Sequence, residues 1–386
     1  MEFAPEGGGI AAFRRLGTTV RTLVISDLHL GSRTDADVLR RDGALEVLVG
    51  ALRAEPPDRL VLLGDLLELR HGPVIDALEA ARPVLEAIGG ALRPQTEVVL
   101  VPGNHDHELI GPWLERRALR RDPPLTLEER ADPQEASDAA AILAAYLEPA
   151  ILSVAYPGVW LRDDVYATHG HLLDRHLTVP TFERLAAGAM ARVVGPLPAP
   201  RATPADYEAA MAPLYAWLHL VARHTQTSFG AERQRGTQGA WRMLTAKGPR
   251  PLKHRAIAAA WPVAVRGLNR LGLGPVHADL SAPALRRAGL AAMGEVTRRL
   301  GIDAAHVIFG HTHRAGPLPQ DDPHEWRAGP DGPRLLNTGS WVHEEVFLDG
   351  QDARSPYWPG RAVEIVDDAP PRLLELLPGW TPPTGR

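Results

Sequence analysis

The stretch Glu97 to Leu109, EVVLVPGNHDHEL, joins an apolar run to a row of polar side chains. The run is mostly Val, which is typical of a strand buried on both faces. A Pro-Gly pair ends it, and then come Asn104, His105, Asp106, His107 and Glu108. Charged groups at the end of a buried strand are costly unless something pairs with them. These five side chains are therefore candidates for binding a charged partner.

The same order, an apolar run followed by a polar group, recurs along the chain. Short runs rich in Val, Leu and Ile lead into Asp27, Asp65 and His311. Helix-like stretches at 36–52 and 74–92 separate the first of these runs. Alternation of buried strands with helices predicts an α/β fold with parallel strands. In such folds the functional groups gather at the carboxyl ends of the strands, where each of these polar residues stands.

The composition limits the kinds of metal site that the chain can build. Its 386 residues are 45% hydrophobic, which suits a large core, and none is Cys. Any bound metal must therefore use His, Asp, Glu or Asn. The N-terminus lacks the pattern of a leader peptide, and no apolar run approaches the roughly 18 residues of a membrane span. We expect a cytoplasmic protein without a transmembrane segment.

Charge is distributed unevenly along the chain. From Tyr207 to Leu300 there are 14 Lys and Arg against four acids, a net of +10, so the rest of the chain carries −15 of the total of −5. The strand pattern also pauses in this region, where helical stretches with Pro and Gly breaks replace it. We predict a core formed by residues 1–174 and 301–386, with a helical, basic insert at 175–300.

Five short motifs follow the predicted strands. They are Asp27-x-His29, Gly64-Asp65, Gly103-Asn104-His105-Asp106, His169 before Gly170, and Gly310-His311-x-His313. A single Asp-x-His pair is a weak signal, because about one is expected by chance in a chain of this composition. Two further pairs do occur, at 174/176 and 322/324, and neither follows a buried strand. Two His flanking one residue at a strand end are more typical of metal ligands than of core histidines.

Together and in this order, the motifs resemble those of the calcineurin-like metallophosphoesterase superfamily, over roughly residues 20–172 and 303–345. The resemblance implies a metallophosphoesterase-type α/β/β/α sandwich that carries the helical insert. It also implies a hydrolase that cleaves a phosphate mono- or diester with two divalent metal ions and a hydroxide bridging them. By this resemblance the ligands are Asp27, His29 and His313 for the first metal, Asn104, His169 and His311 for the second, and Asp65 for both.

The remaining polar residues of the motifs receive expected roles. Mixed oxygen and nitrogen ligands suit Mn²⁺, Fe or Zn²⁺, and the sequence does not choose among the three. The resemblance implies that His105 faces the substrate and stabilises or protonates the leaving oxygen as a general acid. We expect Asp106 to orient His105. His171 is a candidate for contact with the substrate phosphate, whereas His107 and Glu108 are expected at an ordinary helix start or surface position.

The sequence of the insert does not identify the substrate, and several related functions stay possible. This layout most resembles the UDP-2,3-diacylglucosamine pyrophosphohydrolase group, which has a helical cap in the same place. That group, however, usually has Arg where this chain has His105, and its cap is smaller. A nuclease of the same superfamily ranks only third, because such nucleases carry their accessory region after the last motif, where this chain has only about 70 residues. A non-catalytic scaffold of the same fold is the alternative of a different class, and scaffolds typically lose ligands that this chain keeps.

The expected partner is an anionic phosphoester substrate. The basic excess of the insert has a plain interpretation as solvated Arg on amphipathic helices. It also suits a funnel for anions, a membrane-surface patch with Trp217, Trp241 and Trp261, or a nucleic-acid face. Nucleic acid is the least expected of these partners.

Overall fold

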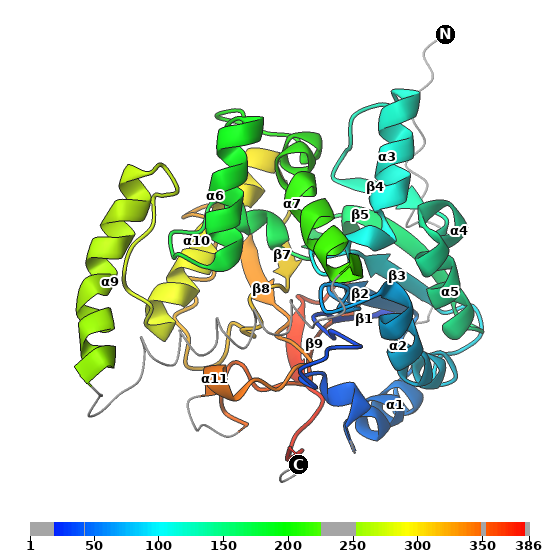
Figure 1. Ribbon diagram of the computed structural model, residues 1–386. Helices are drawn as coiled ribbons and strands as arrows, with labels where there is room; N and C mark the ends of the chain where they lie inside the picture. Colours follow the sequence, from blue (N-terminus) through cyan, green and yellow to red (C-terminus); the bar gives the residue numbers. More distant parts are fainter. Residues whose placement is uncertain (1–18, 42, 225–251, 349–352, 383–386) are drawn as a thin grey trace.

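The computed structural model describes residues 19–41, 43–224, 252–348 and 353–382 (Figure 1). The N-terminal stretch that was read for a leader peptide, and Trp241, lie outside these residues. Nine of the ten strands of the described residues follow one continuous hydrogen-bonded path, in the order β10-β9-β1-β2-β3-β5-β6-β7-β8, and β4 pairs with β5 off this path. Their bounds are β1 (Arg21–Ile25), β2 (Arg59–Leu63), β3 (Glu97–Val101), β4 (Glu128–Ala131), β5 (Ile151–Arg162), β6 (Val165–Thr168), β7 (His306–Phe309), β8 (Arg334–Asn337), β9 (Arg361–Val366) and β10 (Arg372–Glu375).

The long strand β5 divides this path into two layers. Its first residues pair in parallel with β3, and its last residues pair antiparallel with β6. Val24, Val61 and Val99 of the first layer form one buried cluster with Ala167 and Ile308 of the second. The two layers therefore pack face to face, with a dry apolar core between them.

Helices cover the outer face of each layer. The first layer packs under α1 (Ala44–Ala54), α2 (Val74–Gly89) and α5 (Asp138–Tyr146). Leu23 and Leu60 of its strands belong to a second buried cluster, which lies between the layer and these helices. Each central strand thus buries side chains on both faces, which explains its continuous apolar sequence. The second layer packs under η3 (His171–Arg175) and α10 (Ala282–Leu300). This is the predicted α/β/β/α sandwich, and the predicted fold class is confirmed.

The segment between η3 and β7 is helical as expected. It contains α6 (Phe182–Val194), α7 (Pro204–His224), α9 (Leu252–Arg270) and α10. Helices α6 and α7 pack on each other through Ala187, Met211 and Leu214, whereas α9 lies at the left edge of the view in Figure 1. Because α10 covers a strand layer like the other outer helices, we propose that the insert ends before α10 rather than at residue 300. Within the described residues, none of the helices combines the length and apolar character that crossing a membrane requires.

The shorter helical elements lie mostly in the connections. They are η1 (Val38–Arg40), η2 (His107–Leu109), α3 (Gly111–Arg120), α4 (Pro133–Ala136) and α11 (Glu345–Leu348). Helix α3 begins directly after η2, so the residues that follow the quoted strand β3 lead straight into it. This connection places the segment 104–109 between the strand edge and the helices of the insert.

Candidate metal centre

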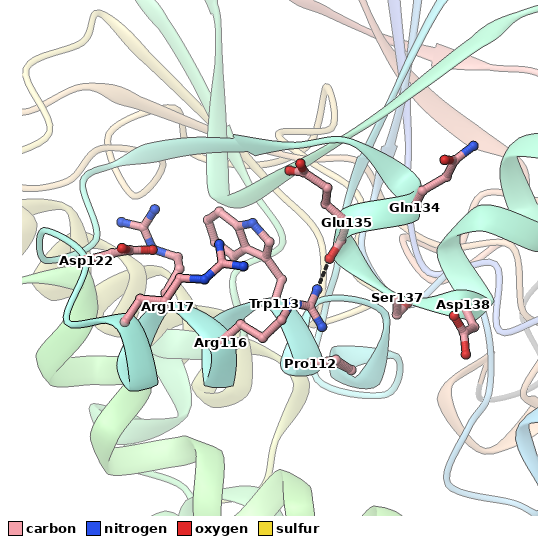
Figure 2. A pocket seen from close by; sticks show the side chains of 10 residues that line it. Pro112, Trp113, Arg116, Arg117, Asp122, Gln134, Glu135, Ser137 and Asp138 are labelled. Carbon is pink, nitrogen blue, oxygen red and sulfur yellow. Dashed lines mark hydrogen bonds between the residues drawn. The ribbon is translucent and has the colours of Figure 1, made fainter.

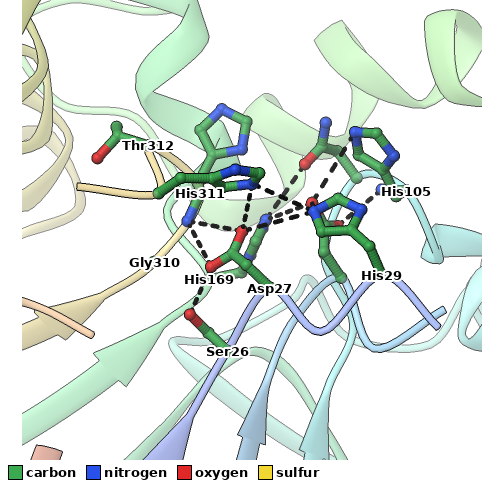
Figure 3. Close-up of polar contacts among 12 residues, drawn as sticks. Ser26, Asp27, His29, His105, His169, Gly310, His311 and Thr312 are labelled. Carbon is green, nitrogen blue, oxygen red and sulfur yellow. Dashed lines mark hydrogen bonds and ion pairs between the residues drawn. The ribbon is translucent and has the colours of Figure 1, made fainter. Parts of the chain in front are cut away.

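The parallel strands bring their following residues to one edge of the sandwich. β1, β2 and β3 are parallel neighbours in one layer, and β6 and β7 are parallel neighbours in the other. Backbone contacts tie the loops of this edge together: His29 N donates to Asp65 O at 2.8 Å, and His311 N donates to Asp27 Oδ2 at 3.0 Å. In Figure 3 the side chains of Asp27, His29, His169 and His311 point toward one another.

The first group of ligand atoms comes from Asp27, His29 and His313, whose nitrogen and oxygen donors all lie within 4.8 Å of one another. Nε2 of His313 is 3.3 Å from Asp27 Oδ1, and Nε2 of His29 is 3.2 Å from Nε2 of His313. These are the three residues predicted for the first metal. Two ring nitrogens and a carboxylate oxygen that converge in this way offer a cation three electron-rich atoms.

The second group comes from Asp65, His169 and His311, again with donors within 4.8 Å of one another. Asp65 Oδ2 lies 3.2 Å from His169 Nε2 and 3.7 Å from His29 Nε2, so it stands between the two groups. Asn104 Oδ1 lies 3.2 Å from His169 Nε2, which brings the fourth predicted residue to this group. Proximity thus reproduces both predicted sets, and metal binding itself stays a prediction.

The far nitrogens of these imidazoles are anchored, as is usual for histidines that bind metals. His29 Nδ1 faces Glu68 Oε2 at 3.1 Å, and His169 Nδ1 faces the carbonyl oxygen of Leu63 at 3.0 Å. His311 is held through its other nitrogen, because Nε2 lies 3.0 Å from Asp174 Oδ1. Each anchor accepts a hydrogen, so the opposite nitrogen keeps its lone pair. The donor set therefore fits divalent ions of the Mn, Fe or Zn type.

The backbone of the site is held in an unusual conformation. Nine described residues other than glycine have a positive φ, and five of them are candidate ligands. These are Asp27 (54°), His29 (47°), Asp65 (49°), His311 (66°) and His313 (57°). Left-handed backbone costs about 1–2 kcal/mol for most residues with a Cβ atom. Such conformations concentrate at functional sites, where the surrounding structure holds them in place.

Two glycines let the backbone approach the side chains of candidate ligands closely. Gly64 has a φ of +83°, and a Cβ atom there would lie 2.2 Å from Nδ1 of His169. A Cβ atom on Gly310 would lie 2.4 Å from Oδ2 of Asp27. Any larger residue would thus displace a candidate ligand, which explains why glycine precedes Asp65 and His311 in the sequence.

The electrostatics of the buried site favour a positive charge among these groups. Burial alone would lower the pKa of His29, but its hydrogen bond to Glu68 and the charge of Asp65 raise that pKa to about 10. Burial opposes the charged form of His169 as well, but Asp65 raises its pKa to about 9. The same imidazoles hold the pKa of Asp65 well below its usual range despite burial. Protons therefore occupy the site when metal is absent.

His105 lies beside both groups, but it is oriented by a different residue than predicted. Its Nδ1 is 2.7 Å from Oε2 of Glu68, and its Nε2 is 3.2 Å from Nη1 of Arg70. Burial and the Arg70 charge lower the pKa of His105 to about 4. Glu68 was missed, although it stands three residues after Asp65 in the motif GDLLE.

The prediction that Asp106 orients His105 is therefore wrong. The carboxylate of Asp106 accepts backbone hydrogen bonds instead, from Leu66 N at 2.7 Å and Gly103 N at 2.7 Å. Burial and nearby Asp65 raise the pKa of Asp106 to about 6. Asp106 thus fixes the loops after β2 and β3 against each other, and it acts on the site through the backbone.

His107 begins the short helix η2, as expected of a helix start, but neither it nor Glu108 is an ordinary exposed position. Nε2 of His107 lies 2.9 Å from Oε1 of Glu208, and Oε1 of Glu108 lies 2.7 Å from Nη2 of Arg223. Both partners belong to α7. The two residues that follow the predicted site therefore fasten a helix of the insert to it.

His171 is fully buried next to the second group. Its ring centroid lies 5.5 Å from that of His169 and 5.7 Å from that of Tyr215. Neither of its nitrogens has a hydrogen-bond partner among the described residues. Its predicted contact with a substrate phosphate stays a prediction.

A cavity of about 300 Å³ opens beside the candidate metal centre. Arg70, Asn104 and His105 line it on the side of the candidate ligands, and residues of η2, α3 and α7 form the rest of its wall. A second cavity, of about 360 Å³, lies on another side of α3 and is lined by Arg116 and Arg117 among others (Figure 2). None of the candidate ligands lines that second cavity.

The chain matches one known family in sequence. The family model described as calcineurin-like phosphoesterase matches residues 20–235. A solved dimetal phosphatase from Danio rerio shares 13% identity at a TM-score of 0.31, with 92% of this chain and 99% of that chain covered. A further solved chain shares 11% identity at a TM-score of 0.32, with 93% and 100% covered. A search of curated proteins found no match.

Proposed function

The chain belongs to the calcineurin-like phosphoesterase family and is a metal-dependent hydrolase of phosphoric esters; from this premise we propose that it uses two divalent ions at the two groups described above. The observation that carries the proposal is the position of Asp65. Its Oδ2 lies within 4 Å of Nε2 of both His29 and His169, at 3.7 and 3.2 Å. One carboxylate oxygen that stands between the two groups can contact an ion on either side, while Oδ1 accepts a hydrogen bond from His105 N at 2.8 Å, so this residue is suited to join two ions.

The two groups of close side chains support the proposed assignment of ligands to the two ions. Asp27, His29 and His313 would hold one ion, Asn104, His169 and His311 would hold the other, and Asp65 would contact both. When bound, such ions would supply an activated hydroxide as the nucleophile and positive charge for the phosphoryl oxygens. The identity of the ions is Mn, Fe or Zn by the ligand chemistry.

The chain's own residues hold and protonate the reacting groups. Glu68 fixes the ring orientations of both His29 and His105. Nε2 of His105 lies on the side of the cavity, where it accepts a hydrogen from Nη1 of Arg70 at 3.2 Å, and it would exchange this contact for one with the substrate. An anionic phosphate beside that nitrogen favours the protonated imidazole, which can then donate to the leaving oxygen. Asp106 keeps the loop that carries His105 in place.

The substrate is an anionic phosphoester, and its leaving group would extend into the cavity between α3 and α7. His171 stays a proposed substrate contact. Contact with a membrane surface and a cytoplasmic location also stay proposals, and the feature that supports surface contact is the exposure of Trp217 and Leu220 on α7, at 50% and 54%. Part of the basic excess lies outside the described residues.

The test is turnover of a chromogenic monoester and its diester, on metal-stripped protein resupplied with Mn²⁺. We expect metal-dependent hydrolysis and two bound ions per chain. Asp65→Asn should reduce both the metal content and the rate. Asp303→Asn, an exposed Asp outside the site, is the matched control and should behave as the parent protein. Two ions retained by Asp65→Asn with an unchanged rate would reject the bridging role.

A further inference from the structure

A buried arginine forms part of the inner wall of the cavity beside the metal centre. Arg70 is 5% exposed and follows Glu68 by two residues. Its Nη1 lies 3.2 Å from Nε2 of His105, and its Nη2 donates to the carbonyl oxygen of Asn104 at 2.9 Å. Because Glu68 takes the hydrogen of His105 Nδ1, Nε2 is the acceptor in this contact. Both groups that receive hydrogens from Arg70 are thus uncharged.

The charge of Arg70 is balanced by two carboxylates to which no hydrogen bond from it is recorded, those of Glu183 and, through its electrostatic effect, Asp174. Its carboxylate contact is with Glu183, whose Oε1 lies 3.8 Å from Nη1, which is beyond hydrogen-bond distance. Its Nε has no hydrogen-bond partner among the described residues. A buried cation with an unused donor is unfavourable unless an anion completes its surroundings. The guanidinium fork is also the side-chain group best matched to a phosphate.

Other buried polar atoms of the same cavity lack partners as well. Tyr215 and Asn104 line it together with Arg70. Within the described part of the chain, the hydroxyl of Tyr215 and Nδ2 of Asn104 make no hydrogen bond. Three unused polar groups around one cavity call for a ligand rich in oxygen acceptors.

We propose that Arg70 binds a phosphoryl oxygen of the substrate and that the enzyme therefore prefers phosphomonoesters over phosphodiesters. A monoester phosphate has three non-bridging oxygens and carries close to two negative charges at neutral pH, whereas a diester has two such oxygens and one charge. If two of these oxygens were held at the metal centre, only the monoester would keep a third oxygen for a guanidinium next to His105. The inference rests on the proposed function, since it names the substrate class of the same site.

The experiment compares Arg70→Ala and Arg70→Lys with the parent protein, all loaded with Mn²⁺. It measures kcat and KM for 4-nitrophenyl phosphate and bis(4-nitrophenyl) phosphate, the dissociation constant of inorganic phosphate by calorimetry, and the metal content. Arg116→Ala, which changes an exposed arginine of the other cavity, is the matched control. Free guanidinium ion is added to Arg70→Ala as a rescue.

We expect Arg70→Ala to keep its metal and to lose about 10- to 100-fold in kcat/KM on the monoester, the size of one charge-assisted hydrogen bond. The loss on the diester should be several-fold smaller, and phosphate should bind about tenfold more weakly. Arg70→Lys keeps the positive charge but not the forked guanidinium, so its kcat/KM on the monoester should lie between those of Arg70→Ala and the parent protein. Guanidinium ion should restore part of the monoester rate, and Arg116→Ala should change nothing.

Equal losses on both esters, or loss of metal, would overturn the inference in favour of a structural role, as would unchanged phosphate binding. If Arg70→Ala does not fold, unchanged phosphate affinity and ester preference in Arg70→Lys would overturn it. A failure of the proposed function would give a different set of results. A parent protein inactive on both esters, whose phosphate binding weakens about tenfold in Arg70→Ala, would keep Arg70 as the anion-binding residue and reject the hydrolase mechanism.

Discussion

Oε2 of Glu68 lies 2.7 Å from Nδ1 of His105 and 3.1 Å from Nδ1 of His29. One carboxylate oxygen therefore joins the residue proposed to face the substrate to a candidate ligand of the first metal. Because a carboxylate only accepts, both rings carry their hydrogen on Nδ1. The Nε2 atoms of both rings then point away from Glu68, that of His29 toward His313 of the metal group and that of His105 toward Arg70 at the cavity.

Glu68→Gln should weaken metal binding about 10- to 100-fold and lower kcat. The amide removes the negative charge and presents a donor to one of the two rings, which must then move its hydrogen to Nε2. Metal titration and turnover check this outcome, with Glu97→Gln, at the start of β3, as the control. Unchanged metal affinity in Glu68→Gln would mean that the two rings are oriented by other contacts.

His105→Ala should lower turnover by roughly a hundredfold or more while the protein keeps its metals. His105 belongs to neither of the two predicted ligand sets, although it can form a group with His29 and Asp65. Turnover and metal content measured on the same sample separate these roles. His306→Ala, at the opposite end of a strand, is the control. A loss of one ion in His105→Ala would make His105 a ligand rather than a residue of the leaving-group side.

The metal-free protein should lose stability as the pH rises from about 6.5 to about 10. The pKa of His29 is raised to about 10 and that of His169 to about 9, so folding favours their protonated forms. A raised pKa stabilises the folded state fully below the unfolded value, and this contribution disappears as the pH passes the folded value. Urea unfolding of metal-stripped protein across this range is the measurement. Metal affinity should rise over the same range, because each ion displaces protons.

A flat stability profile between these pH values would contradict the protonated site. The raised values belong to the metal-free state, so the loaded protein supplies the comparison. Its stability should vary less in this range, since the ions replace the protons and neutral imidazole binds them.

His107 and Glu208 should be energetically coupled by about 1–3 kcal/mol in a double-mutant cycle of unfolding. Both are largely buried, with side-chain exposures of 12% and 14%, and the charge of Glu208 raises the pKa of His107 against the effect of burial. Glu108 and Arg223 form the more exposed pair on the same helix and are the internal control. That pair should couple by less than about 1 kcal/mol, because water screens it.

Equal coupling in the two pairs, or none in the first, would mean that α7 is held by its apolar contacts instead. A perturbed rate in His107→Ala with intact metals would in addition connect the insert to the chemistry at the adjacent His105.

Local sequence predicted most of the central strands and the polar residues at their ends, because both are encoded locally, whereas the division into two ligand sets came from the family resemblance and stays a prediction. A buried strand is a run of apolar residues, and a strand end followed by Asp or His identifies the edge where ligands meet. Strand β5 was not predicted, since Pro157 and Gly158 interrupt its pattern. Its pairing depends on where β3 and β6 lie, which no local window contains.

The wrong assignments share one cause. Asp106 was placed on His105 because the two are adjacent in sequence, but the turn directs its carboxylate back to the amides of Leu66 and Gly103. Asp174 belongs to an Asp-x-His pair outside the predicted strand ends, yet it anchors His311 across 137 residues. His107 likewise finds its partner 101 residues away. Side-chain partners set by the tertiary fold were beyond sequence reasoning.

The left-handed backbone at the five candidate ligands has a consequence for engineering this protein. At a positive φ, glycine and asparagine are more comfortable than aspartate or histidine. A library of variants selected only for heat resistance would therefore accumulate glycine at these five positions. Its members would gain melting temperature but lose the candidate ligands and with them the activity. Thermostabilisation should instead begin at places such as Leu119, an apolar side chain of α3 that is 85% exposed. In this enzyme, the most strained edge is the one that a designer should leave alone.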